Sequence, residues 1–204
     1  DIIAEVDLSL EDPLFSFIEP KLMIYKARSY KEGGNAILAI ETLDEITSKF
    51  SKKNETSEAY YILASISIFD DFNLEKAKEY LDKSIDEKSR SDFGKKAKGL
   101  KGKINAYEDL QDDYYFFSEN TVSDTAIVET KGMNISIPEN NDIALDSLLF
   151  SIGQIFYFDF NQIDSALIRY KYILNKFPDS KYKDQIFNII EYHDDGDFLS
   201  IHDG

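Results

Sequence analysis

The sequence predicts an all-α protein, an α-solenoid of antiparallel helix pairs interrupted by one long irregular insertion. Apolar residues recur at helical spacing along most of the chain, and short polar breaks separate the helical stretches. The composition is 43% hydrophobic and 14% aromatic, which is enough to form a buried core. Each helix has an apolar face too large to bury alone, so we expect it to pack against a neighbour.

The stretch 142–192 carries this pattern most clearly, as a helix, a tight turn, a second helix, a Pro-Asp-Ser break and a third helix. Its apolar positions fall at helical spacing in the first two helices: Leu145, Leu148, Leu149, Ile152 and Phe156, then Ile163, Ala166, Leu167, Tyr170, Ile173, Leu174 and Phe177. We expect one complete helix pair followed by a third helix that caps the stack.

The N-terminal part begins with an acidic arm over 1–12, which we expect to be loosely held. Helical repeats then fill 13–112. The helices are expected at 13–31, 35–50, 57–70, 74–88 and 92–112. Asp12 before Pro13 predicts the start of the first helix, with Pro20 as a kink or early break. Asn73 is a further predicted N-cap.

Three glycines, Gly94, Gly99 and Gly102, lie within the predicted helix 92–112. A glycine inside a helix costs about 1 kcal/mol relative to alanine. We therefore expect these glycines to mark places where a neighbouring helix approaches closely. The pattern is lost over 113–141, an irregular insertion, and the chain ends in an acidic tail over 193–204.

Three helix pairs, over 20–53, 58–91 and 147–180, follow one pattern of small and large residues. In the second helix of each pair an alanine precedes a large residue by four positions: Ala39 and Leu43, Ala77 and Leu81, Ala166 and Tyr170. Pro178 ends the last pair. This pattern resembles the tetratricopeptide repeat, and the string over 166–182 is similar to repeats of bacterial cell-envelope lipoproteins. An ordinary helical bundle or a different α-solenoid is the alternative.

The resemblance implies a superhelix whose concave groove is lined by the first helix of each pair and binds a peptide or a partner protein. The groove positions form a basic end and an apolar middle: Lys21, Ile24, Arg28, Lys31, Ile62, Ile66, Phe69, Ile155 and Phe158. The cations suggest an acidic peptide or a C-terminal carboxylate as ligand. The alternative is that the cations are a solvated face and that the apolar residues pack on neighbouring repeats.

The net charge of −16 argues against nucleic-acid binding, because an acidic surface repels phosphates. No apolar run approaches the roughly 20 residues of a transmembrane helix. The chain starts at Asp1 rather than Met, so a removed targeting signal could still have provided peripheral or lipid-anchored membrane association. We expect the periplasm or the periphery of a bacterial outer membrane, with the cytoplasm as the alternative.

No catalytic residue, metal site or cofactor is predicted. The chain has no Cys, and its two histidines, His193 and His202, lie close to its end. No Gly-rich phosphate loop is present, and no isolated pair of carboxylates lies in an apolar helix face. We therefore expect a non-catalytic scaffold for protein–protein interaction. A cytoplasmic adaptor with the same repeats is one alternative, and a carboxylate-dependent hydrolase on a helical framework is the other.

Overall fold

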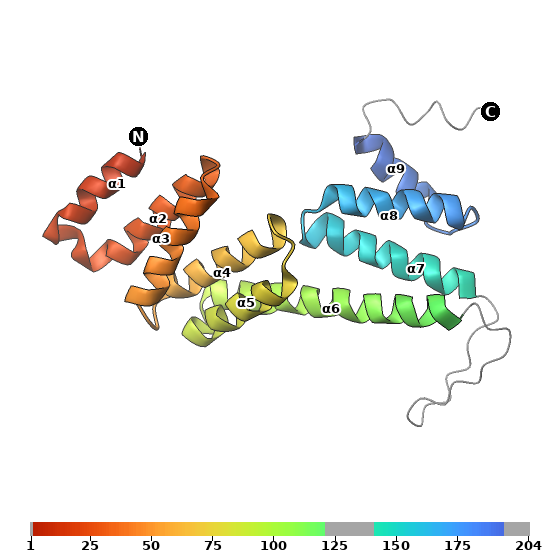
Figure 1. The fold of residues 1–204 in the computed structure, drawn as a ribbon, viewed down its shortest axis with the longest axis horizontal. Helices are drawn as coiled ribbons and strands as arrows, with labels where there is room; N and C mark the ends of the chain where they lie inside the picture. The colour runs from red at the N-terminus through yellow and green to blue at the C-terminus, as the bar shows by residue number, and fades with distance from the viewer. Residues whose placement is uncertain (1, 121–140, 194–204) are drawn as a thin grey trace, which may run out of the picture. The chain divides into compact units, whose positions relative to one another are not determined.

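The computed structural model describes residues 2–120 and 141–193, and all of the regular secondary structure in these ranges is helical (Figure 1). The all-α prediction is thus confirmed for this part of the chain. The chain divides into two compact units, residues 1–104 and 105–204. The boundary falls inside a helix rather than in the predicted insertion.

Unit 1 contains helices that pack on their neighbours in the chain, as the pairs α2/α3 and α4/α5 show in Figure 1. The elements are α1 (Ile2–Glu11), the 3₁₀ helix η1 (Pro13–Ile18), α2 (Glu19–Glu32), α3 (Ala36–Lys49), α4 (Asn54–Phe69), α5 (Leu74–Lys88) and the first part of α6 (Asp92–Asn120). Asn73 caps α5 as predicted, since its side chain accepts a hydrogen bond from the backbone N–H of Lys76. Pro20 falls in the first turn of α2, so the early break expected there is the start of a new helix.

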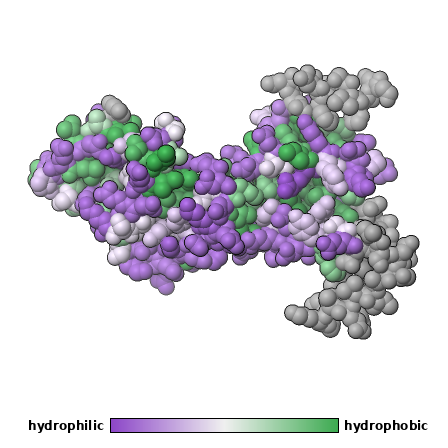
Figure 2. Space-filling view, in the orientation of Figure 1, coloured by the Kyte–Doolittle hydropathy of each residue, from purple (hydrophilic) through white to green (hydrophobic). Residues whose placement is uncertain are grey.

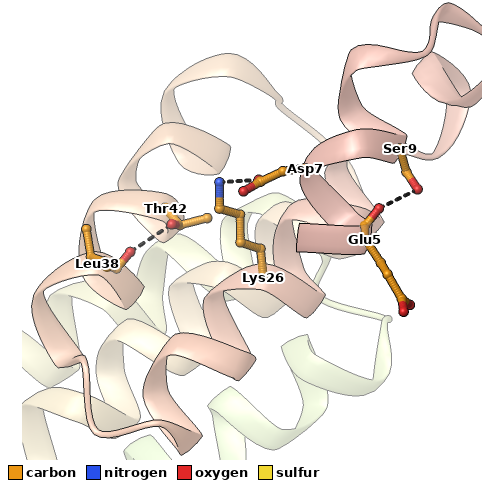
Figure 3. A network of polar contacts seen from close by, with 6 residues as sticks. All are labelled: Glu5, Asp7, Ser9, Lys26, Leu38 and Thr42. Atoms are coloured by element: carbon orange, nitrogen blue, oxygen red, sulfur yellow. Dashed lines mark hydrogen bonds and ion pairs between the residues drawn. The ribbon is translucent and has the colours of Figure 1, made fainter. Parts of the chain in front are cut away.

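The N-terminal segment differs from the loosely held arm that the sequence suggested, because residues 2–11 form helix α1. Val6 is buried, and the Lys26 Nζ of α2 donates a hydrogen bond to the Asp7 carboxylate at 2.6 Å (Figure 3). This contact raises the pKa of Lys26. The buried Val6, the side chain of Leu10 against the core of unit 1 and the Lys26–Asp7 ion pair therefore dock this acidic segment.

The core of unit 1 is built by side chains from α2, α3 and α4. Its buried members are Met23, Ile24, Ala27, Leu43, Ile46, Ala59, Leu63 and Ile66. The small residues Ala39 and Ala77 are fully buried, as is Leu81. Positions that the repeating pattern marks as small or large are thus packed positions, which is the physical basis of the pattern.

The glycine prediction is right at one position of α6 and wrong at the other two. A Cβ on Gly94 would lie 2.1 Å from the backbone oxygen of Lys88, so the turn into α6 requires a glycine there. A Cβ on Gly99 or Gly102 would meet no atom within 4 Å. These two glycines are exposed and mark no helix contact.

Unit 2 consists of the second part of α6 and a helix pair followed by one more helix (Figure 1). The remaining elements are α7 (Asn141–Gln154), the π-helical turn η2 (Ile155–Asp159), α8 (Ile163–Lys176) and α9 (Lys183–His193). The aromatic rings of Phe150 and Tyr182 stack with their centroids 4.0 Å apart. The Tyr157 hydroxyl lies 2.6 Å from Nε2 of His193. The stacked rings hold the segment before α9 on α7, the Tyr157–His193 contact joins the end of α9 to η2, and α9 packs on α8, where a capping helix was predicted.

The predicted insertion, 113–141, is partly helical, because α6 continues to Asn120 and α7 starts at Asn141. Residues 121–140 lie outside the described residues. The same holds for 194–204 of the predicted acidic tail, whereas His193 belongs to α9.

Tyr170 of α8 is fully buried in unit 2. Its ring packs on Phe150, with centroids 5.6 Å apart. Its hydroxyl is buried and has no hydrogen-bond partner among the described residues. Burial raises the pKa of this phenol, because the charged phenolate would lose its hydration.

Replacing Tyr170 with phenylalanine should stabilise unit 2 by about 1 kcal/mol at neutral pH, because it removes a buried hydroxyl without a partner. The gain should grow above the ordinary tyrosine pKa of about 10. There the unfolded wild-type chain loses the phenol proton while the folded chain keeps it, so wild-type stability falls as pH rises. Urea unfolding at pH 7 and pH 11 measures both effects. A variant that is less stable than the wild type at both pH values would contradict this account of the hydroxyl.

Candidate functional site

The apolar residues predicted to line a groove are mostly core residues. Ile24 and Ile66 lie within the buried core of unit 1, and Ile62 packs against it from a partly buried position. Ile155 is buried in η2 of unit 2. In this structure Ile24, Ile66 and Ile155 have little surface to offer a partner. Phe69 is partly buried, and Phe158 is 69% exposed.

The predicted basic end of the groove is partly neutralised. Lys21 is exposed, and its ammonium lies 6.0 Å from the centroid of the Tyr25 ring. Arg28 of α2 forms an ion pair with Glu58 of α4. Burial raises the pKa of Glu58, and the pairing with Arg28 only partly offsets this effect. Lys31 is partly exposed in the last turn of α2. Binding of an acidic peptide or a carboxylate by Lys21, Arg28 and Lys31 therefore stays a prediction.

A surface segment of unit 1 exposes large apolar side chains. Leu14 and Phe17 of η1 are each 77% exposed, and Phe15 is 40% exposed. Leu8, on the neighbouring helix α1, is also exposed. Figure 2 shows hydrophobic surface at the end of unit 1 that α1 occupies. We call Leu8, Leu14, Phe15 and Phe17 the η1 apolar surface. Phe15 also lines a pocket of about 170 Å³ together with Glu11 and Asp12, so carboxylates border this apolar surface.

Unit 2 contains a larger pocket of about 380 Å³ between side chains of α6, α7 and α8. Its lining combines one cation, tyrosine hydroxyls and apolar walls: Gln111, Tyr114, Tyr115, Leu149, Ile152, Ile168, Arg169 and Tyr172. We call it the Arg169 pocket. Leu149 and Ile152 are buried in the wall, whereas Ile168 and Tyr172 are exposed at its rim.

Arg169 is held in place from two sides. The carbon of its guanidinium lies 4.1 Å from the centroid of the Phe156 ring, a cation–π contact. Its Nη1 donates a hydrogen bond to the backbone oxygen of Ser165 at 3.0 Å, one turn earlier in α8. The guanidinium is therefore positioned before any ligand arrives, and part of its hydrogen-bonding capacity remains available.

The charge of Arg169 is poorly compensated. No ion pair joins it to a carboxylate within residues 2–120 and 141–193. Burial lowers its pKa, and the groups that oppose this effect are the phenols of Tyr107, Tyr115 and Tyr114. A half-buried cation surrounded by neutral hydroxyls is costly, and an anion in the pocket would reduce that cost.

Tyrosine side chains surround Arg169, Tyr107 from a buried position and Tyr114, Tyr115 and Tyr172 in the pocket lining. The side chains of Tyr114 and Tyr172 are hydrogen-bonded to each other, and Tyr107 is hydrogen-bonded to Gln111. Burial raises the pKa of Tyr107 and of Tyr114, so both phenols stay protonated at neutral pH. Protonated phenols can donate hydrogen bonds to an anion.

Metal ligands do not gather in the described part of the chain, where no group of three or more His, Asp or Glu side chains could hold an ion. No helix in the ranges described is both long and apolar enough to cross a membrane.

Comparison of the chain with protein-family models, with curated proteins and with solved structures found no match. The arguments for a function therefore rest on the residues themselves.

Sequence reasoning missed the Arg169 pocket, although it identified the helix pair that carries it. Arg169 lies in α8, the second helix of the pair, whereas the predicted groove uses the first helix of each pair. The pocket also needs α6, which the predicted insertion separates from α7 in sequence. A signal was nevertheless present, since tyrosines recur at Tyr114, Tyr115 and Tyr172.

Proposed function

We propose that this protein is a non-catalytic scaffold that binds a partner protein, and that the η1 apolar surface is one of its contact surfaces. The observation that carries the proposal is the exposure of Leu14, Phe15 and Phe17 within one six-residue element. Contiguous apolar side chains at the surface cost solvation free energy, and they are a common mark of interaction sites.

The packing of the described helices supports a repeat scaffold of the tetratricopeptide type. The pairs α2/α3, α4/α5 and α7/α8 are each formed by packed helices, α2/α3 also packs on α4, and α8 packs on α9. The small residues Ala39, Ala77 and Ala166 of these pairs are fully buried. Such pairs stack into α-solenoids in repeat proteins, and their exposed faces bind partners. We propose the solenoid on this basis, in the bacterial envelope or in the cytoplasm.

The chemistry of the η1 apolar surface suggests what its partner presents. Leu14 and Phe17 would be covered by apolar side chains, because burial of apolar area drives association. Glu11 and Asp12 border the surface and would favour cationic groups at the edge of the interface. The partner segment should therefore combine apolar anchors with Lys or Arg.

The double variant Leu14→Ser/Phe17→Ser tests the proposal. Both side chains are mostly exposed, so the variant should fold like the wild type, as circular dichroism can verify. In quantitative affinity purification from the source cells, recovery of the specific partner should fall about tenfold or more, since apolar anchors dominate such interfaces.

Ile37→Ser is the matched control, because Ile37 is 71% exposed on α3 and lies outside the η1 apolar surface. It should leave recovery of the partner unchanged. Equal recovery by the double variant and the wild type would refute the assignment of the contact surface.

A further inference from the structure

We infer that the Arg169 pocket is a binding site for a carboxylate attached to an apolar or aromatic group. The inference is independent of the η1 apolar surface, since the pocket lies in unit 2 and shares no residue with it.

The cation is the first argument. In a chain with 39 acidic residues, a half-buried arginine would readily find an Asp or Glu partner. Among the described residues, the groups that act on the charge of Arg169 are instead the phenols of Tyr107, Tyr115 and Tyr114. A guanidinium presents donors in a planar fork that matches the two oxygens of a carboxylate. The cation–π contact with Phe156 and the bond to the Ser165 backbone oxygen hold this fork in one orientation.

The polar side chains beside Arg169 supply further hydrogen-bond donors for an anion. Tyr114, Tyr115, Tyr172 and Gln111 all line the same pocket. Tyrosine hydroxyls and an amide NH₂ can donate hydrogen bonds to an anion without adding charge. The described residues that line the pocket include no Asp or Glu, so none of them would repel a carboxylate.

The apolar walls of the pocket indicate which chemical group the carboxylate is attached to. Leu149, Ile152 and Ile168 line the other side of the pocket and need an apolar group to cover them. The volume of about 380 Å³ lies at the small end of ligand pockets, which span about 300–1,000 Å³. The pocket therefore suits one apolar residue with its carboxylate, either as a free organic acid or as the last residue of a peptide.

The test uses the full chain and the probe N-acetyl-L-phenylalanine, compared with its amide, which has nearly the same shape and no charge. NMR titration should show shifts of the Arg169 side-chain Nε–H signal and of the amides of α8. The acid should bind about tenfold more tightly than the amide, as expected for a charged hydrogen-bonded pair. Equal affinities, or shifts confined to residues outside the pocket, would overturn the inference.

Two variants locate the site. Arg169→Gln should reduce affinity for the acid about tenfold, and Tyr172→Phe should reduce it less because only one hydroxyl is lost. Arg90→Gln is the matched control, because Arg90 is exposed in unit 1 and should leave binding unchanged. Should Arg169→Gln fail to fold, the comparison of acid with amide on the unchanged protein still decides the question.

A second titration distinguishes the two sources of the carboxylate. The peptide Ala-Ala-Ala-Phe with a free C-terminus should bind at least as tightly as N-acetyl-L-phenylalanine if the natural ligand is a chain terminus. Binding of the single residue with exclusion of the peptide would assign the pocket to a free organic acid. Failure of both acids to bind at millimolar concentration would overturn the inference, and it would leave the proposal for the η1 apolar surface unaffected.

Discussion

Replacing Gly153 with alanine should destabilise unit 2 by about 2 kcal/mol, because the new methyl group would overlap a packed ring. A Cβ on Gly153 would lie 2.5 Å from one ring carbon of Tyr170 and within 3.1 Å of two more. Tyr170 is fully buried against Phe150, so its ring cannot move aside without disturbing the core. The glycine in α7 thus lets α7 and α8 pack closely.

The same substitution at Gly99 should have the opposite sign. Gly99 lies exposed inside α6, and a Cβ there would meet no atom within 4 Å. Alanine should stabilise the helix by about 0.5–1 kcal/mol, since it restricts the unfolded backbone and favours the helical conformation. Gly99→Ala is therefore the matched control for Gly153→Ala.

Urea unfolding of the full chain, combined with hydrogen exchange of the amides in each unit, measures both changes. Hydrogen exchange assigns each effect to its unit, because local opening reports on local stability. Gly153→Ala should lower protection in α7 and α8. Unchanged protection there would show that the Tyr170 ring yields easily, and the explanation of Gly153 by close approach would be wrong.

The two glycine positions illustrate how far sequence reasoning extends. Judged from the sequence alone, Gly99 and Gly153 are alike, because each glycine lowers the helix propensity of a predicted helix. Only the three-dimensional packing separates them, because the ring that fills the space at Gly153 comes from Tyr170 in another helix. The sequence therefore pointed to Gly94, Gly99 and Gly102, of which the last two have open space around them, and it did not single out Gly153.

Helix positions could be predicted where local chemistry determines them. Asn73 caps α5 and the start of α2 follows from Pro20, both through interactions within a few residues. Helix α1 could not be predicted in this way, because its docking depends on Lys26, nineteen positions after Asp7 in the sequence. The sequence could not single out Arg169 as a binding residue, because its half-buried position and its phenol neighbours on α6 arise only when the helices pack together.

Replacing Ser84 with leucine should cost about 3 kcal/mol, which combines the strain of an overfilled helix contact with lost hydrogen bonds. Ser84 of α5 and Ser57 of α4 are both fully buried. Each hydroxyl donates to the backbone oxygen of the other residue, at 2.7 and 2.8 Å. These reciprocal bonds require the two helix backbones to lie very close, so a larger side chain at Ser84 must push them apart.

Two further variants separate volume from hydrogen bonding. Ser84→Ala removes the hydroxyl and adds no volume, and it should cost about 1 kcal/mol. Glu79→Leu adds a leucine at an exposed position of the same helix and should change stability by less than about 0.5 kcal/mol. If Ser84→Leu costs no more than Ser84→Ala in urea unfolding, the helices can separate freely at this point. The close approach of α4 and α5 would then contribute little to the stability of unit 1.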